Sequence, residues 1–412
     1  NKAIKDQTNL WNQLEQKLDS ASNTLNKTSE KMKTAGQGLT VGVTVPLLGA
    51  GAAALKMADT FDSAQGRIQA QLGLTKEESE KLSDVAKSLW KDAYGENVTE
   101  VGNDLVIIKQ YMEDLSDVEL QGVAEGAYAI RDAFGSEIAD TTRTASVLMK
   151  NFEIDGTTAL DLITTSFQRG GDFSGELLDT LREYAPQFKG MGYNAEEFTA
   201  ILIAGAKAGA FNLDKIGDAA KEAFLRIGDG SKTSRDALGS VGLDFKQIEN
   251  DINSGGETAK TAFAAVASAI AGIPDPAKRA QTAVALLGTP IEDLGPEFQT
   301  FFADVNMELG NFEGSTKAAG EALYNNFGTR ATSVFRDFQE DLVPAGEILL
   351  ELAEEWLPKV AEKASELTEA FADLSPEAQE NAIAIAGIAA AAGPLLLGVS
   401  ALTSGVGGLI QV

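Results

Sequence analysis

The chain has 412 residues, with 61 acidic side chains against 34 basic ones, and its formal net charge is −27 at pH 7. Histidine and cysteine are both absent, which excludes the usual zinc sites, Ser-His-Asp and Cys-His catalysis, thiol redox chemistry and disulfides. The acidic balance repels nucleic acid, because phosphate binding needs stripes of Lys and Arg. It suits plain solubility, and it also suits a surface that DNA must slide past.

The length and the ends of the chain indicate several units within a longer protein. The length exceeds that of one ordinary core, so we expect about two or three helical units with connectors. The sequence begins at Asn1 inside a periodic pattern and ends at Val412 inside an apolar run. We therefore expect a piece of a longer chain.

Residues 1–38 predict a coiled-coil helix. One heptad position carries Ile4, Trp11, Leu18, Leu25 and Met32, and the other carries Gln7, Leu14, Ala21, Thr28 and Ala35. Strict spacing of three and four residues favours pairing with other helices, either in another copy or elsewhere in the chain. A lone amphipathic helix packed on the next domain is the alternative.

Residues 39–58 form an apolar segment rich in Gly and Ala, in which Lys56 is the charged residue. Its length is close to that of a membrane span, but its Gly, Thr and Pro content disfavours a membrane helix. We expect burial against protein.

Residues 59–228 predict a core of successive amphipathic helices. Apolar side chains recur three and four residues apart at Val101, Leu105, Ile108 and Met112, at Leu177, Leu181, Tyr184 and Phe188, and at Phe198, Ile201 and Leu202. Capping boxes, in which a side-chain oxygen and an acid three residues later satisfy free amides, fit Thr75 with Glu78, Asn97 with Glu100, and Asn194 with Glu197. Gly205 and Gly209 would let two helices approach closely.

Residues 229–330 predict short helices and long loops. An Ala-rich helix over residues 258–271 should end before Pro274, and a second over residues 279–287 should end at Gly288. The apolar pattern of this region is therefore less regular than that of residues 59–228.

Residues 331–374 predict a long amphipathic helix, with Phe335 and Phe338 at the start of its apolar stripe and Pro344 and Pro358 as kinks or breaks. Residues 375–412 form a hydrophobic, membrane-like segment with no charge from Asn381 onward. This segment fits a hydrophobic hairpin, one kinked span, or two helices packed on a neighbouring protein. The whole pattern predicts an all-α fold.

The sequence offers little chemistry. Residues 228–233 loosely resemble a phosphate loop, but the spacing is wrong and no strand precedes them. Residues 170–176 lack the alternating Asp and Asn of a calcium loop. Acidic pairs such as Glu196 with Glu197 sit in helix first turns, without an apolar pocket that would raise a carboxyl pKa for catalysis. We therefore predict no catalytic, cofactor-binding or metal-binding residues, no cofactor and no enzymatic activity.

The order of these features resembles the core region of tape measure proteins from long-tailed phages. The similarity rests on four segments in order. They are an entry motif with a Thr-x-Pro turn at residues 43–61, a helix end at residues 127–135, a helix start with two Glu residues at residues 191–197, and an exit motif at residues 374–379 followed by a membrane-like stretch at residues 391–396. Residues 99–114 are bulkier than the Gly- and Ala-rich stretch typical of the family.

The resemblance implies an elongated protein inside the tail tube that sets tube length during assembly and leaves with or before the DNA. It also implies self-association, often as a trimer, and contact with the tail tube protein, tail tip or distal tail proteins and assembly chaperones. Apolar segments would enter the host membrane on ejection. The acidic charge of the chain predicts no specific binding of nucleic acid.

Two other functions fit parts of the pattern. A secreted α-helical pore-forming or membrane-active protein also needs a long helix, an acidic body and a hydrophobic hairpin. A cell-wall hydrolase using carboxylates would need a functional Glu that the sequence does not single out.

Overall fold

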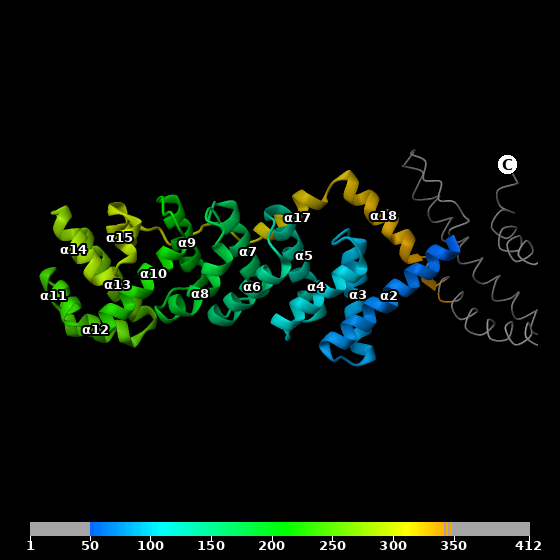
Figure 1. Cartoon of the computed structure of the whole chain (residues 1–412), viewed down its shortest axis with the longest axis horizontal. Helices are drawn as coiled ribbons and strands as arrows, with labels where there is room; N and C mark the ends of the chain where they lie inside the picture. Colours follow the sequence, from blue (N-terminus) through cyan, green and yellow to red (C-terminus); the bar gives the residue numbers. More distant parts are fainter. Residues whose placement is uncertain (1–49, 342, 345–346, 348–412) are drawn as a thin grey trace, which may run out of the picture. The chain divides into compact units, whose positions relative to one another are not determined.

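The computed structural model describes residues 50–341, 343–344 and 347. Every regular element in that part of the chain is a helix, and the all-α prediction is confirmed (Figure 1). The predicted coiled coil of residues 1–38 and the membrane-like segment of residues 375–412 lie outside the described residues, as does most of the predicted helix of residues 331–374.

The chain divides into two compact units. Unit 1 comprises residues 1–102 and 327–412, and unit 2 comprises residues 103–326. The chain passes from the first unit to the second within α4 (Val98–Tyr111). Unit 1 is therefore made from two segments that lie far apart in the sequence.

In unit 1, α2 (Ala50–Leu72) and α3 (Lys76–Lys91) pack together, and α18 (Phe327–Asp341) packs on both. Phe61 meets Trp90 edge to face, with ring centroids 5.7 Å apart. The predicted apolar stripe of α18 is wrong at its start. Phe335 is 47% exposed while Arg336 is buried, because the Arg336 guanidinium donates to backbone carbonyl oxygens at and after the end of α3.

Unit 2 begins as two interleaved rows of helices. Alternate helices contact one another, so α5, α7 and α9 form one row and α6, α8 and α10 the other. Their bounds are α5 Asp117–Phe134, α6 Ile138–Phe152, α7 Gly156–Gln168, α8 Leu177–Gly190, α9 Ala195–Lys207 and α10 Asp214–Gly228. The apolar residues predicted for α8 and α9 are buried between the helices.

The remainder of unit 2 consists mainly of shorter helices. They are α11 (Lys232–Ser240), α12 (Phe245–Ser254), α13 (Gly256–Ala271), α14 (Pro276–Leu287), α15 (Pro290–Leu294), the 3₁₀ helix η2 (Pro296–Gln299) and α16 (Phe301–Asp304). The Ala-rich helix ends at Ala271 as predicted, and Gly288 caps α14. Phe263 contacts both Phe224 and Phe302, with ring centroids 5.3 Å apart in each pair.

After α16 the chain turns back across unit 2. Residues 305–314 contain no helix, and α17 (Ser315–Tyr324) then packs on α5 and α7, as Figure 1 shows. We call residues 305–324 the return segment. It places α17 against helices from the first half of unit 2 in the sequence.

The predicted helix starts are largely confirmed. Thr75 with Glu78 and Asn194 with Glu197 form complete capping boxes. Asn97 accepts a hydrogen bond from Glu100 N at 3.0 Å, but the Glu100 carboxylate accepts from Glu96 N instead of closing the box.

The two glycines expected at a close helix contact differ. A Cβ at Gly205 would lie 1.9 Å from Cδ1 of Ile216, so α9 and α10 approach each other as expected. Gly209 has φ +93° with nothing within 4 Å of an added Cβ, so it is a turn residue.

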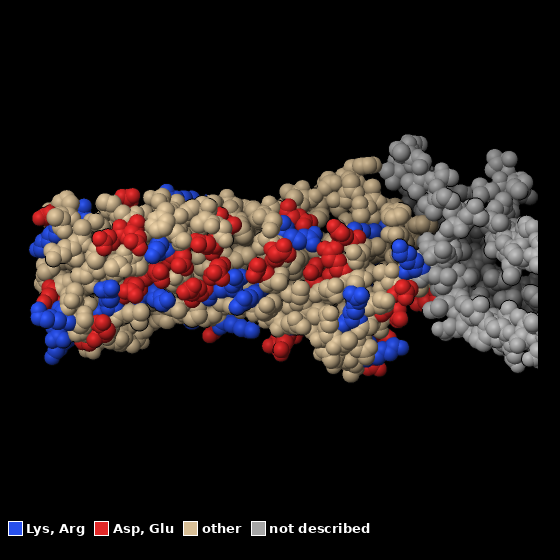
Figure 2. Space-filling view, in the orientation of Figure 1, with Lys and Arg blue, Asp and Glu red and all other residues tan. Residues whose placement is uncertain are grey.

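Charged side chains of both signs are interspersed on the face of unit 2 seen in Figure 2, with acidic groups across its middle. Several pairs are local, such as Lys232 with Asp236 at 2.7 Å, and such exposed pairs add little stability.

Candidate functional site

Residues 228–233 and 170–176, whose sequences were compared with phosphate and calcium loops, connect successive helices. Ser231, within the sequence that resembles a phosphate loop, caps α11 by accepting from Ser234 N at 3.2 Å. Asp172, in the loop compared with calcium sites, accepts from Leu177 N at 3.0 Å at the start of α8. Each polar side chain therefore satisfies a helix terminus.

The acidic pairs also serve the backbone. The pKa of the Glu78 carboxyl is lowered by the hydrogen bond from the Thr75 backbone N–H, and then by the Thr75 hydroxyl. Glu197 closes the box of α9 and lies 3.0 Å from Lys260. Within the described residues, no group of three or more acidic side chains is placed to hold a metal ion.

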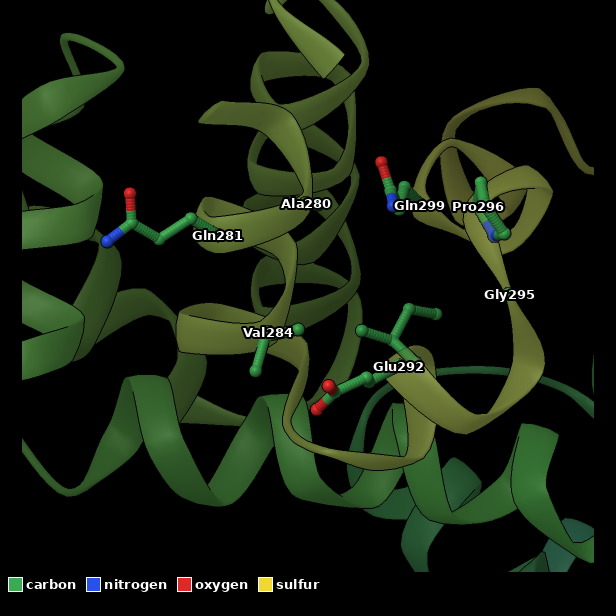
Figure 3. Close-up of a pocket in the computed structure, with 8 residues that line it drawn as sticks. Ala280, Gln281, Val284, Glu292, Gly295, Pro296 and Gln299 are labelled. Carbon is green, nitrogen blue, oxygen red and sulfur yellow. The ribbon is translucent and has the colours of Figure 1, made fainter. Parts of the chain in front are cut away.

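A surface hollow lies between α14, α15 and η2 (Figure 3). Its lining contains Glu292 as the one acidic group, together with amide side chains such as Gln281 and Gln299. Figure 3 shows Gln281 projecting to the side away from Gln299. The polar groups do not converge on one point, and no carboxylate pair is available here for acid-base work.

Within the described part of the chain, no helix combines the length and apolar character needed to cross a bilayer.

The most developed polar arrangement in unit 2 holds the return segment. Asp161 of α7 is 3% exposed, and its carboxylate accepts from Gly314 N at 2.7 Å and from Thr316 N at 2.9 Å. The Gly314 residue at the start of α17 has no capping side chain of its own. Asp161 therefore caps α17 from a different helix, where a negative charge is also favoured by the helix dipole.

Hydroxyl groups extend this contact. The Thr164 and Thr316 hydroxyls are 2.8 Å apart, and the Ser315 hydroxyl donates to the Asp161 carbonyl oxygen at 2.9 Å. The Thr165 hydroxyl donates to Ser315 at 3.1 Å. These pairs satisfy polar groups that burial would otherwise leave without water.

The non-helical part of the return segment is held at Leu309. Its N–H donates to Glu196 Oε1 at 3.0 Å, and its carbonyl oxygen accepts from the Arg169 guanidinium. The Leu309 side chain is 5% exposed. The backbone N–H, the carbonyl oxygen and the side chain of Leu309 are therefore all held by contacts within unit 2.

Both ends of unit 2 are held by α5. The Tyr128 hydroxyl donates to Asp104 at 2.6 Å, near the point where the chain enters unit 2. The Tyr324 hydroxyl donates to Asp132, near the point where the chain leaves. Tyr128 and Asp132 are four residues apart, so they lie on one face of α5.

In unit 1, Arg336 of α18 binds the C-terminal end of α3. Its guanidinium donates to the carbonyl oxygens of Trp90 at 2.7 Å and Gly95 at 2.8 Å, and it lies 5.3 Å from the Trp90 ring centroid. A cation placed at the negative end of a helix is favoured by the helix dipole.

Lys91 strengthens the same contact. It lies 2.8 Å from Glu340 and 3.3 Å from Asp337, both on α18. The hydrogen bond to Glu340 is the main reason that the pKa of Lys91 is raised.

The sequence analysis predicted no site residues and missed both Asp161 and Arg336. Asp161 stands in an apolar run with Leu160 and Leu162 beside it, and a lone acid there is the one trace that the sequence leaves. Its partners lie more than 150 residues later, so pairing could not be read from local spacing.

Comparison with known proteins links the sequence to phage tails. Residues 90–288 match the family model described as phage-related minor tail protein. The class of protein indicated by this match is a phage tail protein. A "Probable tape measure protein" of Streptomyces phage phiC31 is 28% identical over 237 residues, covering 57% of this chain and 32% of that protein. A "Tape measure protein" of Pneumococcus phage Dp-1 is 25% identical over 378 residues, covering 88% of this chain and 31% of that protein.

The predicted family is confirmed: the chain is related to the tape measure proteins of phage tails. It spans about a third of the length of these curated relatives. No solved structure gives a significant match.

Proposed function

We propose that this chain is part of a tape measure protein that sets the length of the tail tube during assembly. The observation that carries the proposal is the similarity over 88% of the chain to a protein named for that role, together with the all-α fold. Helices advance by about 1.5 Å per residue. A helical protein can therefore convert the number of its residues into a distance.

The proposed place of action is the interior of the tail tube, from which the protein leaves with or before the DNA. Its net charge of −27 supports this place, because an acidic surface does not retain phosphate. The apolar residues 39–58 and 375–412 supply surface that would contact the host membrane on ejection.

The proposed partners follow from the same role. Copies of the chain would associate through the heptads of residues 1–38, as a small bundle such as a trimer. Tail tube protein, tail tip or distal tail proteins and assembly chaperones would contact the rest of the protein. The role requires neither a cofactor nor enzymatic chemistry, and both relatives carry structural names.

The test is an insertion of ten extra heptads into the coiled-coil pattern of residues 1–38 in the full-length protein, followed by electron microscopy of the tails. Complete heptads preserve the spacing of the seam. Seventy added helical residues should lengthen the tail by about 105 Å. Tails of unchanged length would contradict the proposal.

A further inference from the structure

The two ends of unit 2 lie close together on one helix. Asp104, near the entry of the chain, is bound by Tyr128, and Tyr324, near its exit, is bound to Asp132. The two α5 positions are four residues apart, which is about 6 Å along a helix axis. Allowing for the length of the two Tyr–Asp side-chain bridges, Asp104 and Tyr324 lie within about 30 Å of each other.

The return of the chain is built into the packing of unit 2. A Cβ added at Gly126 of α5 would lie 2.8 Å from Leu160 of α7 and 3.0 Å from Thr316 of α17. These three helices therefore meet at a contact that is too close for a side chain on α5. Together with the Asp161 cap, this contact fixes α17 beside the helices near the start of unit 2.

The flanking segments reinforce this path. Residues before 103 and after 326 belong to the same unit, within which α18 is bound to α3 through Arg336. The chain therefore leaves unit 1, folds as unit 2 and re-enters unit 1. A domain inserted between neighbouring points of a scaffold has this connectivity.

We propose that residues 103–326 form a folded insertion, here called the excursion, within the part of the protein that measures tail length, here called the ruler. The excursion adds almost nothing to the length that the ruler measures. As one straight helix, these residues would span about 340 Å. Folded as described, they advance the chain by no more than the short separation of their ends. The inference rests on the proposed function and assigns the measuring role to residues outside unit 2.

The central experiment replaces residues 103–326 by a short Gly-Ser linker in the full-length protein and measures tail length by electron microscopy. The expected result is tails of the parental length. Shortening that approaches about 340 Å would overturn the inference, because the deleted residues would then have been counted in extended form.

The ten-heptad insertion serves as the companion variant. In one outcome, the insertion lengthens tails by about 105 Å and the deletion shortens them in proportion to the residues removed. This outcome supports the tape measure function but contradicts the inference that residues 103–326 are not measured. If the insertion leaves the length unchanged, the ruler itself is wrong, and the inference fails with it. Lengthening by the insertion with no effect of the deletion supports both.

A second measurement covers the case in which the deletion prevents tail assembly. The chain contains no cysteine, so Asn103→Cys and Asn325→Cys add one pair of spin-label sites to it, with any cysteine elsewhere in the full-length protein replaced by serine. Labelled protein diluted with unlabelled copies would be assembled into tails. A distance below about 40 Å between labels supports the excursion, whereas loss of measurable coupling between them would overturn it.

Discussion

The carboxylate of Asp161 accepts a hydrogen bond from the backbone N–H of Thr316 at 2.9 Å, although the two residues are 155 positions apart in the chain. Asp161 thereby caps a helix to which it does not belong. A local cap stabilises one helix, but this one also fixes where the returning chain docks. The position of α17 is thus coupled to the integrity of α7.

The Asp161→Ala variant should release the return segment. It removes both hydrogen bonds to the backbone of Gly314 and Thr316, which should lower the free energy of unfolding by about 2–4 kcal/mol. Hydrogen exchange should accelerate across residues 305–324. Asp155→Ala is the matched control, because Asp155 caps its own helix through Thr158 N at 2.8 Å. Equal effects of the two variants on exchange at α17 would contradict the assigned role.

A buried polar residue with distant partners, such as Asp161, marks the limit of what the sequence predicts. The stripe Leu177, Leu181, Tyr184 and Phe188 could be placed correctly, because its spacing is local and its side chains are all buried. The capping boxes at Thr75 and Asn194 were likewise confirmed. The buried Asp161 could not be explained, since its partners come from the far end of unit 2.

Arg336 gives the opposite case, in which periodicity was misleading. The stripe included Phe335, yet Arg336 is the buried residue, since its guanidinium donates to the Trp90 carbonyl oxygen at the end of α3 and to the Gly95 carbonyl oxygen beyond it. The energetic gain depends on a helix terminus about 240 residues earlier. Hydrophobic spacing alone contains no information about such a terminus.

Replacing Arg336 by Lys should loosen α18. A lysine has no planar fork and cannot reach the same set of carbonyls, so we expect a loss of about 1–3 kcal/mol in the free energy of unfolding of unit 1. Faster hydrogen exchange in α18 would report the change. Arg330→Lys is the control, because Arg330 is an exposed residue of the same helix. A destabilisation of similar size at position 330 would rule out this explanation.

Two glycines on α5 should respond to substitution in opposite ways. Gly126→Ala places a methyl group 2.8 Å from Leu160, and we expect destabilisation by about 1–3 kcal/mol through overpacking. Gly122→Ala meets nothing within 4 Å, so the better helix propensity of Ala should stabilise the protein by about 0.5–1 kcal/mol. Urea unfolding midpoints of the two variants provide the comparison. A Gly126→Ala variant as stable as the parent would contradict the close junction of α5, α7 and α17.

Stability should depend on pH mainly on the acid side. The pKa of Glu119 is lowered by the Ser116 hydroxyl and N–H, and that of Asp155 by the Thr158 N–H. Carboxyls with a lowered folded pKa contribute stability above the ordinary value of about 4, and this is lost as pH falls through the folded pKa. Asp92, whose pKa is raised by burial, acts in the opposite direction.

With no histidine in the chain, we expect a nearly flat stability profile between about pH 6 and 8 and a decline in acid. Urea unfolding across this range is the measurement, and Glu119→Gln should reduce the acid-side slope. A step in stability near pH 6.5 would show that this assignment of the titrating groups is incomplete.

The proposed tape measure function depends most on the conversion of helical residues into tail length. A series of tails carrying about five, ten and fifteen added heptads in residues 1–38 tests this conversion directly by electron microscopy. We expect tail length to rise linearly, with a slope of about 1.5 Å per added residue. A slope of zero would contradict the tape measure function.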